Sequence, residues 1–576
     1  MTDDNDINAE VVSVFPNKVR IAVNDLFSFE IAGQSLRVGS FLKISDNDNV
    51  SLICIIESFS IEMRAKGDDH QRVYMIDAYP LGTLKGNTFR RGGDELAIPP
   101  KKVVPATRAE IAAIYANAFL QEQRLCFSSL TRQRDVKVPV YGDRFFNKHI
   151  AVVGASGSGK SSSVARILQE ATAAKSDGYT GLNNSHIVIF DIHGEYASAF
   201  PSAKLLSADD IVLPYWLLND GEMSDMFLES GDSNNYNQEA LLRSIITHCK
   251  EMANPGVAKV NFDSPLKYDM THLQTCFMNL SRETKDANDP LTIKTKDGNS
   301  VTYADDRARL TAYSNNVIDF ALKVQGKINN GPYADGTIDK FVRRISAKVN
   351  NARLGFMFGS TALEATLEDV IRQITGYEKT SSANVTIIDL SGIPFEVLSI
   401  TVSLVTRLLF DFSYHARRQT GKCETPFLLV YEEAHKYAPR SDLARFKASL
   451  SSIERIAKEG RKYGVSLMIS SQRPSEISET IFSQCSNFLA MRLTNPDDQA
   501  YVKRLLPDTL GNLTAGLPAL EQGEALLIGD AVAMPCVVYV NECSPRPSSN
   551  DIRYYEIWKN PWHAAGVSDD FDHWLK

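Results

Sequence analysis

The sequence lacks long apolar runs. No stretch of about eighteen uncharged apolar residues, the length that a membrane-spanning helix needs, occurs in its 576 residues, so we expect no membrane span. The first ten residues, MTDDNDINAE, are acidic and contain no apolar segment, which argues against a secretory signal. The eight cysteines are scattered singly without a C-x-x-C pair, which excludes a disulfide framework or a zinc site. We therefore expect a cytoplasmic protein whose cysteines are small buried apolar residues.

A surplus of basic residues is also absent. The chain has 70 Asp and Glu against 62 Lys and Arg, which gives a formal net charge of −8. Proteins that coat nucleic acid are usually basic, because neutralisation of phosphates dominates their affinity. Any contact with nucleic acid must therefore be confined to a local groove or pore. The length of 576 residues exceeds one ordinary hydrophobic core, so several domains are expected.

The pattern of residues changes along the chain. Within residues 1–100, short β-branched and aromatic runs such as VRIAV and SFLKI alternate with turn residues, which predicts a small β-barrel. The proline-rich stretch PPKKVVPATRAE then indicates a linker. Strand and helix patterns alternate over 101–200 and again over 381–545, which predicts an α/β core with a parallel sheet. Residues 201–380 are predicted as a mostly helical insertion, and residues 546–576 as a C-terminal tail.

A glycine-rich loop follows the apolar strand that ends in AVV. Its sequence GASGSGKSS fits the pattern G-x4-G-K-[ST], with a strand before it and a helix after it. The backbone N–H groups of such a loop bind the phosphates of ATP. We expect Lys160 to contact the β- and γ-phosphates and Ser161 to bind Mg²⁺. The predicted nucleotide-binding residues are Gly154, Ala155, Ser156, Gly157, Ser158, Gly159, Lys160, Ser161 and Ser162.

Two acids and a glutamine end other predicted strands. In FLLVYEEAH, a buried strand leads to Glu432, which can hold the Mg²⁺ water shell, and to Glu433, which can orient the attacking water. Adjacent acids also occur on solvated surfaces. VSLMISSQRP ends in Gln472, which could detect the γ-phosphate or simply occupy a turn. DIHGEY places Asp191 and Glu195 after another strand, on the side where functional groups gather.

A basic segment, ERIAKEGRKYG, is predicted at a helix end. Arg461 could act as a finger that stabilises charge on the transferred phosphoryl group, or it could lie on a solvated helix end favoured by the helix dipole. For Arg455 the second interpretation is favoured. His193 lacks companion Cys or His residues and is a poor metal ligand, and the other histidines carry no functional prediction.

Four segments in this order resemble the HerA-type hexameric DNA translocases of the HerA/FtsK superfamily: HIAVVGASGSGKSS, IFDIHGEY, VYEEAHKYAP and IAKEGRKYGVSLMISSQRP. The resemblance covers most of the chain and is weakest over about 200–380. It implies a RecA-like P-loop ATPase core with a parallel sheet, preceded by a small N-terminal β-barrel and carrying a helical insertion. Where the family has an Asp-Glu pair, this chain has Glu432 and Glu433, and we expect the longer side chain still to reach metal-bound water.

The resemblance also implies roles for individual residues. Glu432 is the acid of the metal site, Glu433 the catalytic glutamate, Gln472 the sensor and Arg461 the finger. Arg144 and Lys148 lie where family members carry basic residues near the subunit interface. Residues that could line a DNA channel are Arg343, Arg344, Lys348, Arg445 and Lys447, each of which is also typical of an ordinary helix surface.

The expected assembly is a homo-hexameric ring with ATP sites between subunits and double-stranded DNA in the central channel. Family members act with a nuclease, and some in bacteria act in antiphage defence beside nucleases or sirtuin-like effectors, so such a partner is expected by analogy. The alternative is a nucleotide-binding ring scaffold that assembles and activates a partner with little or no translocation. DNA-stimulated ATP turnover and displacement of a roadblock separate these two functions.

Overall fold

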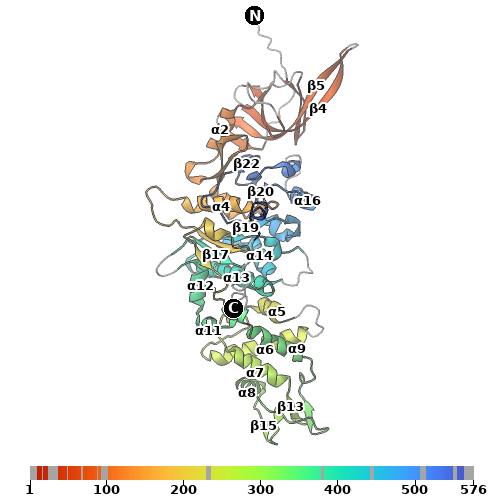
Figure 1. Ribbon diagram of the computed structural model, residues 1–576, viewed down its shortest axis with the longest axis vertical. Coiled ribbons are helices and arrows are strands. Elements are labelled where there is room, and N and C mark those ends of the chain that lie inside the picture. Colours follow the sequence, from red (N-terminus) through yellow and green to blue (C-terminus); the bar gives the residue numbers. More distant parts are fainter. Residues whose placement is uncertain are drawn as a thin grey trace.

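The chain forms an elongated molecule with three tiers along its long axis (Figure 1). The structure is a computed structural model, and it describes residues 9–15, 17–23, 37–47, 50–66, 69–86, 88–92, 102–228, 235–377, 382–440, 447–505, 514–548 and 554–562. An all-β tier lies at one end, a large sheet flanked by helices lies in the middle, and a mostly helical tier lies at the other end. Within these ranges, every helix is too short or too polar to span a lipid bilayer.

The first tier is a seven-stranded antiparallel sheet in the order β2-β1-β7-β3-β4-β5-β6. An additional pairing between β2 and β5 closes the sheet on itself, which fits the predicted barrel-like shape. Alternate residues such as Val19, Ile21 and Ile44 point into its core, as the period of two predicts. Its strands are β1 (Ala9–Phe15), β2 (Lys18–Val23), β3 (Phe41–Asn47), β4 (Val50–Lys66), β5 (Asp69–Lys85), β6 (Thr88–Arg91) and β7 (Lys102–Pro105).

The stretch interpreted as a linker in fact contains strand β7. Val104 of this strand pairs with Lys43 of β3, and Lys102 pairs with Glu10 of β1. The prolines around it suggested a linker, but Val103 and Val104 have the β-branched side chains that favour a strand, and Val103 is buried in the core. The closed sheet therefore needs a strand that lies beyond residue 100.

The middle tier is an eleven-stranded mixed sheet in the order β12-β17-β11-β18-β19-β10-β20-β21-β22-β8-β9. The strands from β12 to β20 are parallel and the remainder are antiparallel. The predicted α/β class is confirmed, although the sheet is not parallel throughout. Its strands are β8 (Arg124–Leu130), β9 (Gln133–Tyr141), β10 (Ile150–Val153), β11 (His186–Asp191), β12 (Lys204–Leu206), β17 (Val385–Asp389), β18 (Phe427–Tyr431), β19 (Val465–Ser471), β20 (Asn487–Met491), β21 (Glu524–Gly529) and β22 (Cys536–Val540).

The central parallel strands are mostly apolar because helices cover both faces of the sheet. Every residue of β10, β18 and β19 is buried. The helices outside the third tier are α2 (Arg108–Asn117), α3 (Gly142–Asn147), α4 (Lys160–Ala173), α12 (Leu367–Thr375), α13 (Phe395–Thr420), α14 (Ala448–Glu459), α15 (Glu479–Gln484), α16 (Pro496–Leu505) and α18 (Tyr554–Trp558).

The third tier is inserted between β12 and β17 and is mostly helical, with a small four-stranded sheet at its far end (Figure 1). This sheet interrupts the helical insertion predicted for residues 201–380, and its first three strands contain the β-branched residues Thr284, Thr292 and Val301, which favour strands. The elements are α5 (Asp220–Phe227), α6 (Asn235–Ala253), α7 (Met270–Leu280), α8 (Asp306–Asn315), α9 (Asp339–Val349), α10 (Gly355–Phe358), α11 (Ser360–Glu364), β13 (Thr284–Asp286), β14 (Thr292–Lys294), β15 (Ser300–Thr302) and β16 (Ile328–Asn330).

Buried polar contacts join the third tier to the middle tier. Glu222 of α5 is fully buried and accepts hydrogen bonds from Ser403 and Arg407 of α13, with a 2.9 Å bond from Arg407 Nη2. Asp225 of α5 accepts bonds from the backbone N–H groups of Lys447 and Ala448 at the start of α14. Since a buried charge is costly without partners, these bonds fix the position of α5 against the core.

Candidate nucleotide site

The glycine-rich loop connects β10 to α4 in a geometry that only glycine fits at several positions. Gly157 and Gly159 have positive φ angles of 72° and 94°. A Cβ atom on Gly154 would lie 2.9 Å from the Cβ of Met491. The hydroxyl of Ser158 is buried and has no hydrogen-bond partner. The loop therefore brings backbone N–H groups and the start of α4 together in the arrangement that binds phosphate.

Lys160, the first residue of α4, forms a buried ion pair with Glu433. Its Nζ lies 2.6 Å from Oε1 of Glu433, and the two side chains are 6% and 3% exposed. Burial alone would raise the pKa of Glu433, but the Lys160 cation and the Gln472 backbone N–H outweigh it and hold that pKa below its ordinary value. Glu433 is therefore an ionised carboxylate directly beside the phosphate loop.

The backbone at Glu433 is in the left-handed region, with φ 45° and ψ 47°. A residue with a long side chain adopts this conformation at a cost of about 1–3 kcal/mol, and such strain clusters at functional sites. Its carboxylate is held from several directions: Oε2 accepts a 3.2 Å bond from the Gln472 N–H and lies 3.3 Å from Nδ1 of His435. The strained turn at the end of β18 thus directs the carboxylate toward α4.

Glu432, the preceding residue, lies beside another buried carboxylate. Burial and the charge of Asp191 raise the pKa of Glu432 to about 9. Asp191 itself accepts hydrogen bonds from the backbone N–H groups of His193, Glu195 and Tyr196, so it shapes the turn after β11. Two neighbouring carboxyl groups with few cationic partners are the environment that a divalent cation stabilises.

Gln472 follows β19 and is half-buried. Its backbone N–H is the group that binds Glu433. Because β10, β18 and β19 are parallel neighbours, their carboxyl ends bring together the phosphate loop, the two glutamates and Gln472. Among the described residues, no group of three or more His, Cys, Asp and Glu side chains is placed to hold a metal ion, so a Mg²⁺ ion at this site would depend on Ser161, Glu432, water and phosphate oxygens.

The predicted finger, Arg461, lies at the amino ends of the parallel strands, opposite the phosphate loop. The two residues predicted near a subunit interface, Arg144 and Lys148, lie at the same end. Arg461 belongs to the 3-10 helix Gly460–Tyr463 just before β19, and Arg144 and Lys148 come just before β10. β19 has seven residues, so it separates its two ends by about 20 Å at ~3.3 Å per residue. Arg461 therefore cannot reach the phosphate loop of its own chain. Lys148 pairs with Asp530 at 2.5 Å.

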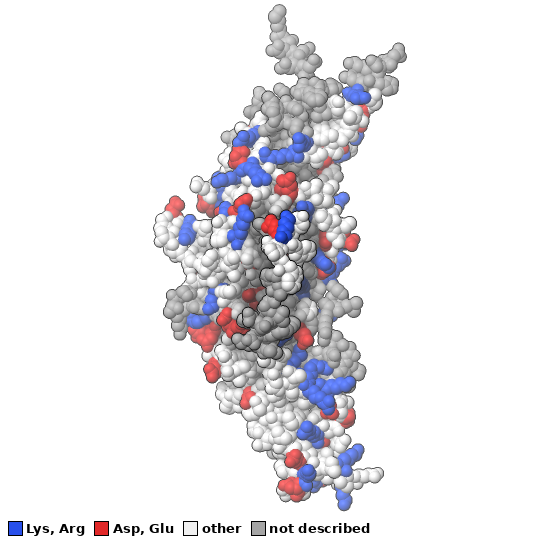
Figure 2. Space-filling view, in the orientation of Figure 1, with Lys and Arg blue, Asp and Glu red and all other residues white. Residues whose placement is uncertain are grey.

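The residues predicted to line a channel differ in their surroundings. Arg343 of α9 is exposed, whereas Arg344 donates to a backbone carbonyl of α5 and Lys348 to a carboxylate of α13. Lys447 is exposed at the start of α14, and Arg445 lies outside the described residues. Figure 2 shows Lys and Arg side chains gathered at the level of α9 on the face in view.

His149 is a structural residue of this region that the sequence did not reveal. It is fully buried; its Nδ1 accepts a 3.0 Å bond from the N–H of Leu467, so the proton is on Nε2, which donates a 3.1 Å bond to the carbonyl of Ala457. These two bonds bracket the segment that carries Arg461. Nothing in the local sequence around His149 indicates partners more than 300 residues away.

The buried His149 predicts a loss of stability in acid. Burial, together with the Arg461 charge, lowers the pKa of His149 from 6.5 to about 4. Below about pH 6.5 the unfolded chain binds a proton at this residue that the folded chain does not bind, so the free energy of unfolding falls as the pH drops toward 4, by at most about 3 kcal/mol. Urea unfolding at pH 7, 6 and 5 measures this change in the free energy of unfolding.

We expect His149→Asn to lose this part of the pH dependence and the matched variant at the exposed His415, His415→Asn, to keep it. An unchanged pH dependence in His149→Asn would contradict the assignment.

Comparison with known proteins gives consistent matches. Residues 125–409 match the family model described as the central domain of the helicase HerA. A probable helicase from Methanocaldococcus jannaschii is 23% identical over 573 residues, which is 96% of this chain and 94% of that protein. The DNA double-strand break repair helicase HerA of Sulfurisphaera tokodaii is 24% identical over 481 residues, or 83% and 81% of the two chains. Among solved structures, VirB4 of Thermoanaerobacter pseudethanolicus superposes with a TM-score of 0.45 and 13% identity, covering 74% of this chain and 98% of that one.

Proposed function

We propose that this chain, which is an ATPase of the HerA family, uses ATP hydrolysis to move along double-stranded DNA. The family membership and the ATPase activity follow from the matched central domain and from relatives that span nearly the whole chain. Relatives are named as DNA double-strand break repair helicases, and this supports DNA as the polymer that the protein moves along. The finer proposal is that the core is RecA-like, that the first tier is the family's barrel, and that six copies form a ring.

The buried pair of Lys160 and Glu433 supports a hydrolytic role for both residues. When ATP binds, Lys160 would leave the carboxylate of Glu433, 2.6 Å away in this structure, for the β- and γ-phosphates. Glu433 would then be free to orient a water molecule for attack on the γ-phosphorus, and Gln472 would lie within reach of that phosphate. Mg²⁺, held by Ser161 and Glu432, would supply positive charge to the phosphate oxygens.

The placement of Arg461 is the observation that supports a ring. The phosphate loop lies at the carboxyl ends of the parallel strands, and Arg461 and Arg144 lie at the amino ends. A head-to-tail contact between copies brings the carboxyl ends of the strands in one copy to the amino ends in the next. Repeated contacts of this kind close into a ring. An arginine from one copy would then stabilise charge on the phosphoryl group bound by the next, so hydrolysis would be coupled to movement between subunits.

The proposal also includes a cytoplasmic location and a partner protein in antiphage defence. The partner would be a nuclease or a sirtuin-like effector. This part is supported by the motif resemblance alone, since the four segments resemble those of translocases that work beside such effectors.

The experiment that tests the proposed function measures ATP turnover and movement together. We expect linear double-stranded DNA to stimulate ATP hydrolysis by the purified protein and the protein to displace streptavidin from biotinylated DNA ends. Lys160→Ala serves as the control without turnover. ATP-dependent assembly with a partner but no displacement of the roadblock would instead support the scaffold function. A monomer whose ATP turnover is indifferent to added DNA would contradict the translocase.

A further inference from the structure

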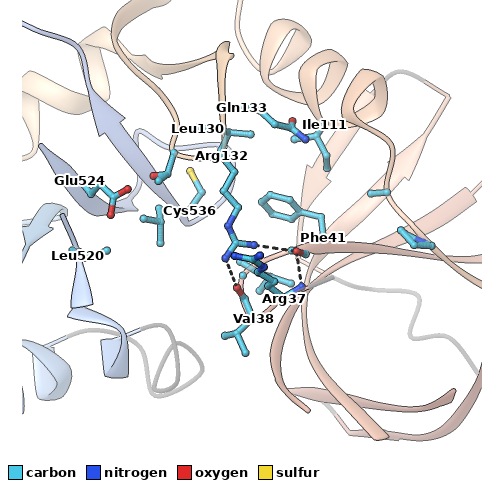
Figure 3. Close-up of a pocket in the computed structure, with 17 residues that line it drawn as sticks. Arg37, Val38, Phe41, Ile111, Leu130, Arg132, Gln133, Leu520, Glu524 and Cys536 are labelled. Carbon is cyan, nitrogen blue, oxygen red and sulfur yellow. Dashed lines mark hydrogen bonds between the residues drawn. The ribbon is translucent and has the colours of Figure 1, made fainter. Parts of the chain in front are cut away.

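A cavity of about 560 Å³ lies where the closed sheet meets the core, away from the predicted catalytic residues. We call it the junction cavity (Figure 3). Its walls come from residues 37–41 of the closed sheet, residues 130–133 at the β8–β9 turn, and β21 and β22 of the core. Its volume lies within the range of about 300–1,000 Å³ typical of small-molecule sites. No predicted function of the chain accounts for it.

Two arginines lie side by side in the junction cavity, as Figure 3 shows for Arg132 and Arg37. Among the described residues, Arg132 donates bonds of 3.4 Å to the Ser40 hydroxyl and the Val38 carbonyl, and neither oxygen carries a charge. Burial and the neighbouring charge of Arg37 both lower the pKa of Arg132. Two guanidinium groups that lie together favour an anionic group whose oxygens both can reach, such as a phosphomonoester.

Hydrogen-bond acceptors lie on the other parts of the wall. Thr131 and Gln133 of the β8–β9 turn form the wall beside Arg132. Glu524 lies across the cavity from the arginines in Figure 3, and its Oε2 accepts a bond from the Glu521 N–H. The carboxylate of Glu524 can accept further hydrogen bonds, so it favours a ligand that carries N–H or O–H donors.

The remaining surface of the cavity is apolar. Ile55 and Leu130 are buried there, and the ring of Phe41 and the side chain of Val537 complete the wall. Such a surface takes a flat apolar body rather than a hydrated ion. Inorganic phosphate alone would leave it uncovered.

We propose that the junction cavity binds a nucleoside monophosphate. Arg37 and Arg132 bind the phosphate, the apolar wall covers the base, and Glu524 accepts hydrogen bonds from the base or the sugar. A phosphate presents several oxygens to the donors of the two guanidiniums, and a nucleobase supplies both the flat apolar body and the N–H donors.

The junction cavity is also connected to the phosphate loop by a short covalent and hydrogen-bonded path. Glu524 follows Gly523, whose N–H donates a 3.0 Å bond to the carbonyl of Ser158. A Cβ atom on Gly159 would lie 3.2 Å from the nitrogen of Gly523, so the loop and this turn are closely packed. A ligand that holds Glu524 therefore acts on the segment that supports the phosphate loop, and bound nucleotide would change the apparent KM for ATP in the wild-type protein.

The test uses the full-length Lys160→Ala protein, in which binding at the phosphate loop is impaired, with AMP, adenosine and inorganic phosphate as probes in isothermal titration calorimetry. We expect saturable AMP binding with a Kd below about 1 mM and much weaker binding of adenosine and phosphate, because each lacks half of the interactions. Adding Arg132→Ala should weaken AMP binding at least about tenfold. Arg353→Ala, at an exposed arginine elsewhere, is the matched control and should leave it unchanged.

Two further variants test the site if Arg132→Ala does not fold. Arg132→Lys keeps a charge without the paired donors and should bind AMP with intermediate affinity, and Val537→Phe should fill the cavity and block AMP while leaving both arginines in place. Absence of saturable AMP binding to the Lys160→Ala protein, or equal AMP affinity in the Arg132→Ala and Arg353→Ala variants, would overturn the proposal. Binding of an acidic peptide in place of AMP would also overturn it.

Discussion

Replacing Glu433 with glutamine is expected to leave ATP bound and reduce its hydrolysis at least about a thousandfold, because the side chain that orients the attacking water loses its charge. The buried carboxylate lies 2.6 Å from Lys160 and is held in a strained backbone conformation. Glutamine has nearly the same shape, so it keeps the packing of the turn and frees Lys160 for the phosphates. Single-turnover hydrolysis of radiolabelled ATP, together with filter binding, separates the two effects.

The matched comparison for this variant is Lys160→Ala. This substitution removes the cation that binds phosphate and also leaves Glu433 buried without its ion-pair partner, so we expect loss of both ATP binding and hydrolysis, with reduced stability. Measurable turnover near the wild-type rate in Glu433→Gln would show that another group orients the water. His435, whose Nδ1 lies 3.3 Å from Glu433, would then be the next residue to substitute.

Replacing Arg461 with alanine is expected to abolish turnover in the pure variant and to permit its partial recovery in mixed assemblies. Arg461 lies at the amino ends of the parallel strands, whereas Lys160 lies at their carboxyl ends. Arg461 can therefore serve only the nucleotide site of another copy. If Arg461→Ala and Lys160→Ala subunits are mixed in equal amounts, about a quarter of the contacts join an intact phosphate loop to an intact arginine. Steady-state ATP turnover of the mixture, measured against each pure variant, detects this recovery.

Arg455→Ala provides the control for this experiment. Arg455 lies on α14 near Arg461, but its guanidinium covers the ring of Phe410 at 4.3 Å and lies 3.6 Å from Asp411. We expect its loss to affect packing within the subunit and to leave the turnover of the assembly largely intact. Full turnover in pure Arg461→Ala would show that this residue is not the finger. Arg144, which also lies at the amino ends of the parallel strands, would then be the remaining candidate.

The fold was predictable where local patterns determine it. The glycine pattern between an apolar strand and a helix placed the phosphate loop at the end of β10, and the acids after FLLVY placed Glu432 and Glu433 at the end of β18. The prediction of strands failed where the local sequence pattern is weak. Prolines before β7 and at its last residue concealed this strand, and the three-residue strands β13, β14 and β15 are too short to show a period.

Local sequence determined most of the long strands and helices and which residue types end them, because side-chain periodicity and glycine geometry act within a few residues. Tertiary structure decided which strands become neighbours. That choice paired Lys160 with Glu433, 273 residues apart, and placed Arg461 at the amino ends of the parallel strands. It also gathered three remote segments around the junction cavity. Burial of apolar surface and satisfaction of polar groups over the whole chain set these pairings, and no short segment records them.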